Sequence, residues 1–349
     1  MSRHAVVLFN LGGPDRPAAV EPFLFNLFND PAIIGLPTPL RWLMAKLISK
    51  RRAPVAQKIY AELGGGSPLL ELTRKQAAAL EEYFARQNQG PAHGTGQETR
   101  VFIAMRYWHP MSDETVARVK DFDPETIHLL PLYPQFSTTT TGSSLDDWRR
   151  AAARAGLDAP ATWTCCYPTH VGWVSALAGL TALALNEPEG KGARILFSAH
   201  GLPKKIVAAG DPYQAQVEQT AAAVVGELES RGVLCADWTV CYQSRVGPLE
   251  WIGPSLDEAL SAAAADGVPV VVVPIAFVSE HSETLVELDI EYRNKARDLG
   301  VPGYLRVPAV GTDPDFISTL AALVAAGGRG DRACPDEWKK CPHTGGTLG

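Results

Sequence analysis

The stretch Ile195-Leu-Phe-Ser-Ala-His200-Gly-Leu-Pro203 organises our interpretation of the whole chain. Its apolar start, Ile195 to Phe197, predicts a buried β-strand, and Gly201 and Pro203 end that strand in a turn. The imidazole of His200 is therefore expected at the carboxyl end of a strand, where open α/β sheets bind their ligands. A lone histidine after an apolar run is more often a satisfied core residue, so a reactive role requires support from elsewhere in the chain.

An internal repeat gives that support, because the pattern of strand and turn occurs in both halves of the chain. It predicts an α/β fold of two similar Rossmann-like lobes, each a parallel sheet flanked by helices, with equivalent strand ends facing a cleft between the lobes. We expect the first lobe over residues 1–164, the second over 165–326, and a tail over 327–349. The matching segments are 8–14 with 196–203, 102–107 with 239–244, and 127–131 with 270–274.

Composition limits the class of protein. A chain of 349 residues that is 46% hydrophobic can bury a sizeable core. Its net charge of -6 argues against a nucleic-acid partner, since the only basic cluster is Lys50 to Arg52. Six cysteines are too few for a disulfide scaffold, and no signal-peptide pattern or apolar run of about 18 uncharged residues stands out, so we expect a reducing, cytoplasmic setting. No nucleotide cofactor is expected.

The segment Glu21–Lys50 combines many large apolar residues with basic ones. Within it, Pro39–Ser49 predicts an amphipathic helix with a basic side that includes Arg41 and Lys46. Such a helix, with Trp42 on it, can lie on a membrane surface or line the mouth of an apolar pocket. Ordinary core helices are the alternative.

The segment between residues 64 and 120 predicts ordinary helices, a loop and a strand, and it contains a glycine-rich run with two possible roles. A helix is expected over Leu69–Gln87 and another over Ser112–Lys120, separated by a surface loop over residues 88–98 and a strand over Arg100–Arg106. The glycine-rich run at Gly64–Pro68 could bind an anion through backbone N–H groups at the head of the first helix, or serve as a flexible connector.

Three glutamates follow the strand that is predicted to end at Pro274. Glu283, Glu287 and Glu291 are four residues apart, which would stack their carboxylates on one face of a helix capped by Ser279. Like charges at this spacing repel each other unless a cation or a proton relieves them. Because the helix begins at a strand end near His200, the group could bind a divalent cation or move protons, although a solvated acidic face is the alternative. It does not resemble a closed zinc site, which needs four N or S ligands.

Seven ordered motifs carry a family resemblance that runs from about residue 5 to 325. They are Asn10-Leu-Gly-Gly-Pro, Gly64-Gly-Gly-Ser-Pro, Arg106-Tyr-Trp-His-Pro, Tyr133-Pro-Gln-Phe-Ser, Phe197-Ser-Ala-His-Gly-Leu-Pro, Tyr242-Gln-Ser-Arg-Val-Gly-Pro and Phe277-Val-Ser-Glu-His-Ser-Glu-Thr-Leu. Together they resemble the ferrochelatase family, whose members insert Fe²⁺ into protoporphyrin IX to make haem. The resemblance implies two Rossmann-like lobes that enclose a porphyrin cleft.

The resemblance also implies roles for individual residues. His200 and Glu283 correspond to the metal-site and catalytic pair, and His281, Glu287 and Glu291 to the residues beside it that guide metal or protons. Our hypothesis is that neutral His200 accepts pyrrole protons and that Glu283 guides the metal, since carboxylates are hard oxygen ligands. The positions that correspond to porphyrin contacts are Asn10, Leu11, Arg52, Tyr60, Ser67, Arg106, Tyr107, Arg245 and Trp251.

The tail resembles those of ferrochelatases that hold a [2Fe–2S] cluster. A cluster normally needs four thiolates, and this tail has two, Cys334 and Cys341. Thr138 stands where animal-type members have a ligand cysteine. The resemblance allows a set of Cys166, Cys334, Cys341 and either Cys165 or His343; free cysteines on a flexible tail are the alternative.

Two other functions compete with this interpretation. A related chelatase could act on a coproporphyrin or insert cobalt, and a non-enzymatic protein could carry haem or metal. The carrier would have no need of a carboxylate series directed at a histidine. If the family function holds, the segment Glu21–Lys50 would take the substrate from the inner face of a membrane by peripheral contact. The sequence does not predict the oligomeric state.

Overall fold

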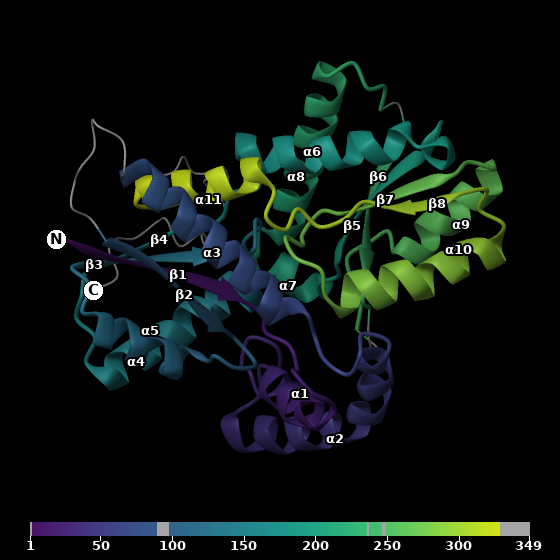
Figure 1. The fold of residues 1–349 in the computed structure, drawn as a ribbon. Helices are drawn as coiled ribbons and strands as arrows, with labels where there is room; N and C mark the ends of the chain where they lie inside the picture. The colour runs from purple at the N-terminus through teal and green to yellow at the C-terminus, as the bar shows by residue number, and fades with distance from the viewer. Residues whose placement is uncertain (1, 89–97, 236, 246–248, 329–349) are drawn as a thin grey trace. The chain divides into compact units, whose positions relative to one another are not determined.

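The computed structural model describes residues 2–88, 98–235, 237–245 and 249–328 (Figure 1). By their internal contacts these residues form two compact units. The first contains the chain up to Cys165 and from Leu320 onward, and the second contains Cys166–Thr319. The chain therefore returns to the first unit before residue 326, where the repeat places the end of the second lobe.

The first unit is built on a four-stranded parallel sheet in the order β2-β1-β3-β4. The central strand β1 (Arg3–Asn10) pairs with β2 (Glu98–Met105) on one side and β3 (Thr126–Pro131) on the other, and β3 pairs with the short β4 (Ala161–Trp163). Continuous apolar runs suit these strands because helices cover both faces of a parallel sheet.

Helices complete the first unit. Helix α3 lies on one face of the sheet, and α4 and α5 pack together on the other (Figure 1). The predicted helices over 69–87 and 112–120 are confirmed with slightly longer bounds. The elements are η1 (Pro17–Ala19), α1 (Val20–Phe28), α2 (Thr38–Ala61), α3 (Leu69–Asn88), α4 (Ser112–Phe122), η2 (Thr138–Gly142) and α5 (Ser143–Ala155), with α11 (Pro314–Ala326) entering this unit from the second.

The second unit repeats the design in the order β6-β5-β7-β8. Strands β5 (Arg194–His200), β6 (Trp238–Gln243), β7 (Val270–Pro274) and β8 (Tyr304–Arg306) occupy the places of β1, β2, β3 and β4, and all of them are parallel. Each of the three segment pairs recognised in the sequence falls on one such pair of strands. The predicted α/β fold with a repeated parallel sheet is confirmed.

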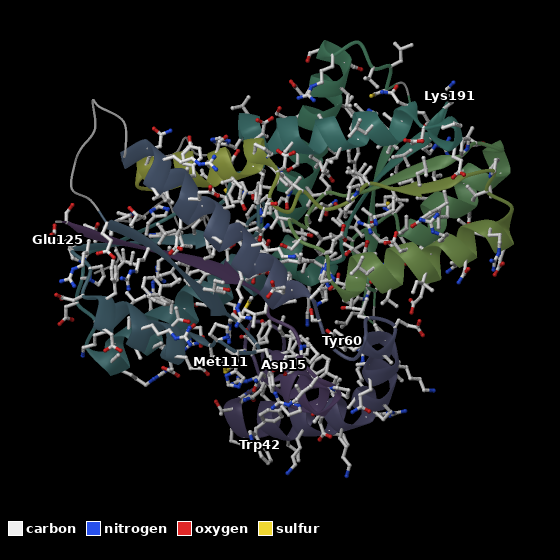
Figure 2. The ribbon with its side chains drawn as sticks, in the orientation of Figure 1. Asp15, Trp42, Tyr60, Met111, Glu125 and Lys191 are labelled. Carbon is white, nitrogen blue, oxygen red and sulfur yellow. The ribbon has the colours of Figure 1, made fainter. Side chains whose placement is uncertain are left out.

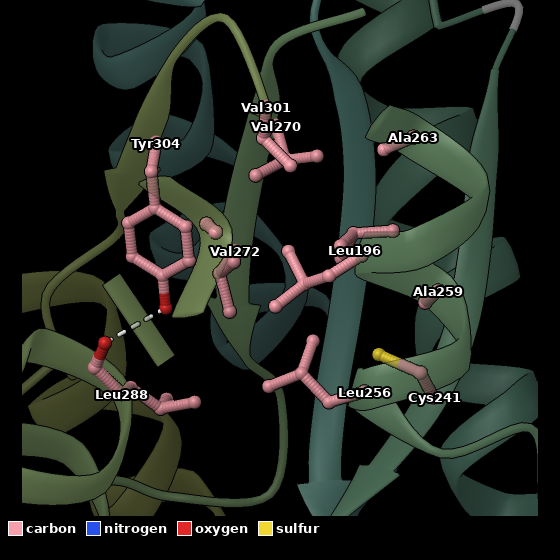
Figure 3. Close-up of a cluster of buried hydrophobic side chains, with 12 residues drawn as sticks. Leu196, Cys241, Leu256, Ala259, Ala263, Val270, Val272, Leu288, Val301 and Tyr304 are labelled. Atoms are coloured by element: carbon pink, nitrogen blue, oxygen red, sulfur yellow. Dashed lines mark hydrogen bonds between the residues drawn. The ribbon is translucent and has the colours of Figure 1, made fainter. Parts of the chain in front are cut away.

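The helices of the second unit pack on this sheet over an apolar core. Figure 3 shows part of it, where Leu196 of β5, Val272 of β7 and Leu256 of α9 meet in a cluster without charged side chains. Helix α9 starts with a capping box made by Ser255 and Glu258, which satisfies backbone N–H groups at its first turn. The elements are α6 (Val171–Asn186), η3 (Pro188–Gly190), α7 (Lys204–Ala208), α8 (Tyr213–Ser230), α9 (Leu256–Asp266), η4 (Glu283–Tyr292) and α10 (Arg293–Leu299).

Helix α2 is longer than the amphipathic helix predicted over residues 39–49. The expected helix over 39–49 is the first half of an element that continues through Pro54 to Ala61, because Lys50 to Ala53 contain no turn residue that would stop it. Its large apolar side chains are not in the core: Leu40, Leu43 and Leu47 are 55%, 59% and 63% exposed. The buried positions of α2 are Ala45, Ser49, Ala53 and Tyr60. The core-helix alternative is therefore wrong for this face.

Candidate active site

The second unit brings His200 and Glu283 together at the carboxyl end of its sheet. His200 is the last residue of β5, and Glu283 is the first residue of η4. The imidazole Nδ1 lies 2.8 Å from the Glu283 Oε2, a hydrogen-bond distance. The two side chains are 43% and 22% exposed, so the pair is held by the protein and remains open to a ligand. The strand-end position predicted for His200 is confirmed.

The helix that carries the glutamates is a π-helix, with hydrogen bonds between residues i and i+5, and not the α-helix expected from the spacing. The predicted cap at Ser279 is also wrong, since the residue before η4 is Ser282, and its side chain makes no capping hydrogen bond. At the start of the helix the Thr284 Oγ1 accepts a hydrogen bond from the His281 backbone N–H over 3.0 Å. Helices of this kind occur frequently at functional sites.

Two residues at the end of β6 bind the second glutamate. The Ser244 backbone N–H donates to Glu287 Oε1 over 2.9 Å, and its hydroxyl donates to Glu287 Oε2 over 2.6 Å. The Gln243 amide donates to the Glu287 Oε2 over 3.3 Å and is itself held by Ser198 of β5, at 2.7 Å. Ser244 has φ of 60°, a left-handed conformation that aims both of its donors at one carboxylate.

Gln243 and Ser244 were not predicted as site residues, although both lie in one of the seven motifs. A signal was available, because β6 neighbours β5 and parallel strands end at the same edge of a sheet. The residues that follow β6 were therefore expected beside His200. The same edge holds Tyr213 of α8, which is buried; burial, and then the charges around it, raise its pKa well above the usual value for tyrosine.

The electrostatics of the site separate the two glutamates. Burial alone would raise the pKa of Glu283, but the charge and hydrogen bond of His200 lower it to about 2. Burial would lower the pKa of His200, and the Glu283 carboxylate raises it above the usual value. Burial and then the neighbouring Glu283 raise the pKa of Glu287 to about 7. At neutral pH Glu283 is therefore ionised, and Glu287 can gain or lose a proton.

The remaining predicted neighbours lie on either side of this pair. His281 is buried, its ring centroid is 4.6 Å from that of Phe277, and burial lowers its pKa, so its imidazole is neutral. Glu291 is exposed, which means that the carboxylates progress from Glu283 inside to Glu291 at the surface.

Trp251 and Arg245 border the same edge. A Cβ atom on Gly201 would lie 3.3 Å from the Trp251 ring and 3.0 Å from the Gln243 carbonyl oxygen, so glycine is needed for the indole to approach the chain beside His200. The Arg245 guanidinium lies 3.6 Å from the Glu258 carboxylate, and the Arg245 side chain is 32% exposed.

In the first unit, Asn10 and Ser67 make local structural contacts. The Asn10 amide donates to Thr73 over 3.0 Å, and its Oδ1 accepts from the Leu11 N–H over 2.8 Å. The Ser67 Oγ accepts from the Leu69 N–H over 3.3 Å at the start of α3. Their contacts with a porphyrin stay predictions.

Arg106 and Tyr107 are tied to a buried carboxylate, Asp30, which the sequence did not reveal. The Tyr107 hydroxyl and the Arg106 guanidinium each donate to Asp30 Oδ2 over 2.8 Å, and Tyr107 is 1% exposed. These contacts give both residues a structural role in joining the loop after α1 to the end of β2. Tyr60 is buried in the same region, while Arg52 is exposed above the Phe28 ring.

Of the predicted cluster ligands, the structure describes Cys165 and Cys166. Among the residues that the structure describes, no group of three or more His, Cys, Asp or Glu side chains has the geometry of a metal site. Cys165 is buried, and Cys166 is partly buried, with its Sγ 3.4 Å from the Gln216 amide nitrogen. Cys334, Cys341 and His343, predicted as cluster ligands, lie outside the described residues.

Solved structures share this fold at low sequence identity. The chain aligns with SirB from Bacillus subtilis with Fe³⁺ at a TM-score of 0.54 and 13% identity, covering 94% of this chain and 96% of that one. A second SirB structure from Bacillus subtilis subspecies spizizenii, in complex with cobalt, aligns at a TM-score of 0.51. These likenesses concern the fold alone.

Sequence relatives are much closer. The family model described as ferrochelatase matches residues 3–327. The ferrochelatase of Caulobacter vibrioides is 52% identical over 97% of this chain and 96% of its own length. That of Pelagibacter ubique is 47% identical over 97% of this chain and 98% of its own length. The chain belongs to the ferrochelatase family, and it is an enzyme of the metal chelatase class.

Proposed function

We propose that this chain inserts Fe²⁺ into protoporphyrin IX to form protohaem, with release of two protons. The observation that carries the proposal is the His200–Glu283 pair, 2.8 Å apart at the end of β5, with Glu287 and Glu291 continuing from it towards solvent. Metallation needs a group that accepts protons from pyrrole nitrogens and oxygen ligands that hold Fe²⁺ weakly enough to release it. This pair offers both within hydrogen-bond distance.

In this mechanism His200 is the base. The neutral form of its partly exposed imidazole accepts a pyrrole proton, and the Glu283 carboxylate stabilises the charge that results. Glu283, the buried end of the carboxylate series, guides the metal. Glu287, with a pKa near 7, then takes up protons near neutral pH, and Glu291 releases them to solvent. Two protons leave the porphyrin for each Fe²⁺ that enters, so charge balances.

The macrocycle itself has to deform, since a planar porphyrin presents neither its lone pairs nor its N–H bonds to a metal. A site that bends it binds a form closer to the transition state. We assign this role to contacts from the nine positions that correspond to porphyrin contacts in the family; one of them, Trp251, lies beside Gly201, next to His200.

Helix α2 supports a peripheral membrane contact. Among the described residues, no helix is long and apolar enough to cross a bilayer. Leu43 and Leu47 of α2 are nevertheless exposed, and the Lys46 Nζ lies 5.0 Å from the centre of the Trp42 ring. Trp42 itself lies on the outer side of α2 (Figure 2). Exposed apolar side chains interspersed with lysine and arginine suit an anionic lipid surface. We assign α2 the task of taking an apolar porphyrin from the inner face of the membrane.

The [2Fe–2S] cluster stays a prediction with two alternatives, ligation by the tail cysteines or free thiols. The described residues offer Cys166 as a partly buried thiol, and three further ligands would have to join it. No step of the mechanism depends on the cluster. Anaerobically purified protein should show visible absorption that disappears in a Cys334→Ser, Cys341→Ser double variant if the cluster is present, and a colourless protein would favour free thiols.

One assay tests the main proposal. The full chain is mixed anaerobically with protoporphyrin IX and Fe²⁺, or with Zn²⁺ as a stable substitute, and the porphyrin absorption bands are followed. Metallation faster than the protein-free background is the expected result; an unchanged rate with tight porphyrin binding would favour a carrier. Coproporphyrin and Co²⁺ in parallel reactions distinguish the related chelatases, because a higher kcat/KM with either one would replace the proposed substrate.

A further inference from the structure

The π-helix η4 is held from outside by the edge strand β8. Helix η4 runs for ten residues, although π-helices are rare and mostly single-turn features, so this backbone needs support from its surroundings. The Tyr304 hydroxyl donates to the Leu288 carbonyl oxygen over 2.8 Å (Figure 3). The Arg293 guanidinium, just after η4, donates in return to the Tyr304 carbonyl oxygen over 2.9 Å.

Arg306, two residues along β8, makes the strongest of these contacts. Its guanidinium binds the Asp289 carboxylate of η4 in a bidentate manner, with the Nε at 2.9 Å from Oδ1 and Nη2 also paired. Nη1 binds Glu280 Oε1 at 2.5 Å, and the Ala309 N–H donates to the same oxygen over 2.9 Å. The Arg306 side chain is 8% exposed, so these pairs are only weakly screened by water.

The contacts of β8 lie on both sides of the active glutamates along the chain. Glu280 precedes Glu283, while Leu288 and Asp289 follow Glu287 directly. Residues one or two positions apart on a helix face different directions, so Glu287 can face Ser244 while Asp289 faces Arg306. The helix is thus bound on one side by the residues of the site and on the other by the edge strand.

We propose that Tyr304 and Arg306 are positioning residues that hold η4 in the register that places Glu283 against His200. We call Tyr304, Arg306, Glu280 and Asp289 the β8 clamp. This inference rests on the proposed function for its catalytic consequence. A small shift of η4 would break the 2.8 Å hydrogen bond between Glu283 and the His200 imidazole. Residues that orient such ligands typically contribute about 10- to 100-fold to activity.

The experiment compares four variants of the full chain by Zn²⁺ insertion and by hydrogen–deuterium exchange. Arg306→Gln should lower kcat about 10- to 100-fold with little change in the KM for porphyrin, and should speed amide exchange in residues 283–292. Arg306→Lys keeps the charge without the bidentate geometry and should recover part of kcat. Tyr304→Phe, which removes a single hydroxyl, should lower kcat and speed amide exchange in the same way but by less. It replaces Arg306→Gln in the test if that variant does not fold.

Arg194→Gln is the matched control. Arg194 stands at the opposite end of the same sheet, at the start of β5, and also bridges two carboxylates, Asp237 and Asp266, each at 2.9 Å. Its loss should lower thermal stability comparably while leaving kcat and exchange in residues 283–292 at their wild-type values. Equal losses of kcat in Arg306→Gln and Arg194→Gln, or unchanged kcat and exchange in Arg306→Gln and Tyr304→Phe, would overturn the clamp. A wild-type protein without metallation would overturn the proposed function, while exchange would still test the clamp.

Discussion

The hydroxyl of Ser244 donates to the Glu287 carboxylate over 2.6 Å, and it lies 3.3 Å from Glu283 Oε2. One short side chain thus contacts both glutamates of the site. Its two hydrogen bonds to Glu287 oppose burial and the charge of Glu283, which together raise the pKa of Glu287 to about 7. Without Ser244 the protonated form of Glu287 would persist to higher pH.

We therefore expect Ser244→Ala to shift the acid limb of the pH–rate profile upward. The hydroxyl stabilises the ionised form, so its loss raises the pKa of Glu287 beyond 7, and activity that requires ionised Glu287 begins at a higher pH. The profile of kcat/KM for Zn²⁺ insertion between pH 5.5 and 9 measures the shift. Ser261→Ala, on the surface of α9 where its hydroxyl binds a helix carbonyl, is the control and should leave the profile in place.

The His200–Glu283 pair makes a second prediction. His200→Asn keeps the size of the side chain and a hydrogen-bond donor but cannot accept a proton, and metallation should fall by about 100-fold or more. Glu283→Gln should also lower activity and should lower the pKa of His200, because burial then acts without the opposing charge of Glu283; NMR of the ring can measure this change. His109→Asn, at an exposed histidine paired with Glu114, should behave as wild type. Normal metallation by His200→Asn would show that His200 is not the base.

The same residues show how much of the site could be predicted from the sequence. His200 and Glu283 follow apolar strands, and the repeat places both strand ends at one sheet edge, so their meeting was predictable from periodicity and topology. Ser244 was not recognised because its role depends on a left-handed φ that neither the motif nor its neighbours require. The π-helix was hidden too, since a spacing of four residues fits an α-helix, and the contacts that stabilise the wider helix come from Tyr304 and Arg306, distant in sequence.

We expect α2 to bind lipid through its exposed leucines. A Leu43→Glu, Leu47→Glu double variant should bind phosphatidylglycerol-containing vesicles at least about tenfold more weakly, because each leucine loses the free energy of burial in lipid. Sedimentation with vesicles measures the effect. Leu183→Glu on α6, where the leucine is 65% exposed, is the control and should not alter binding. Equal binding by both variants would remove α2 from the proposed membrane contact.

The burial of His128 is expected to make the protein less stable in mild acid. This effect does not involve the residues of the active site. It is fully buried in β3, and its two ring nitrogens lie 2.8 and 2.9 Å from the hydroxyls of Thr162 and Thr164. Burial, with a smaller contribution from His4, lowers its pKa to about 3. Above about pH 6.5 the histidine is neutral in both folded and unfolded chains, so it causes no pH dependence there.

Below that pH the unfolded chain binds a proton that the folded chain does not, so the free energy of unfolding falls by about 1.4 kcal/mol per pH unit down to pH 3. Urea unfolding at pH 7.5 and pH 5 should show this contribution as about 2 kcal/mol. In His128→Gln, which fills the site without titrating, the total loss between these pH values should be smaller by that amount, even though the variant starts from a lower stability. If the wild type and His128→Gln lost equal stability between the two pH values, the histidine would have to be protonated inside the folded sheet, which its paired nitrogens and its burial oppose.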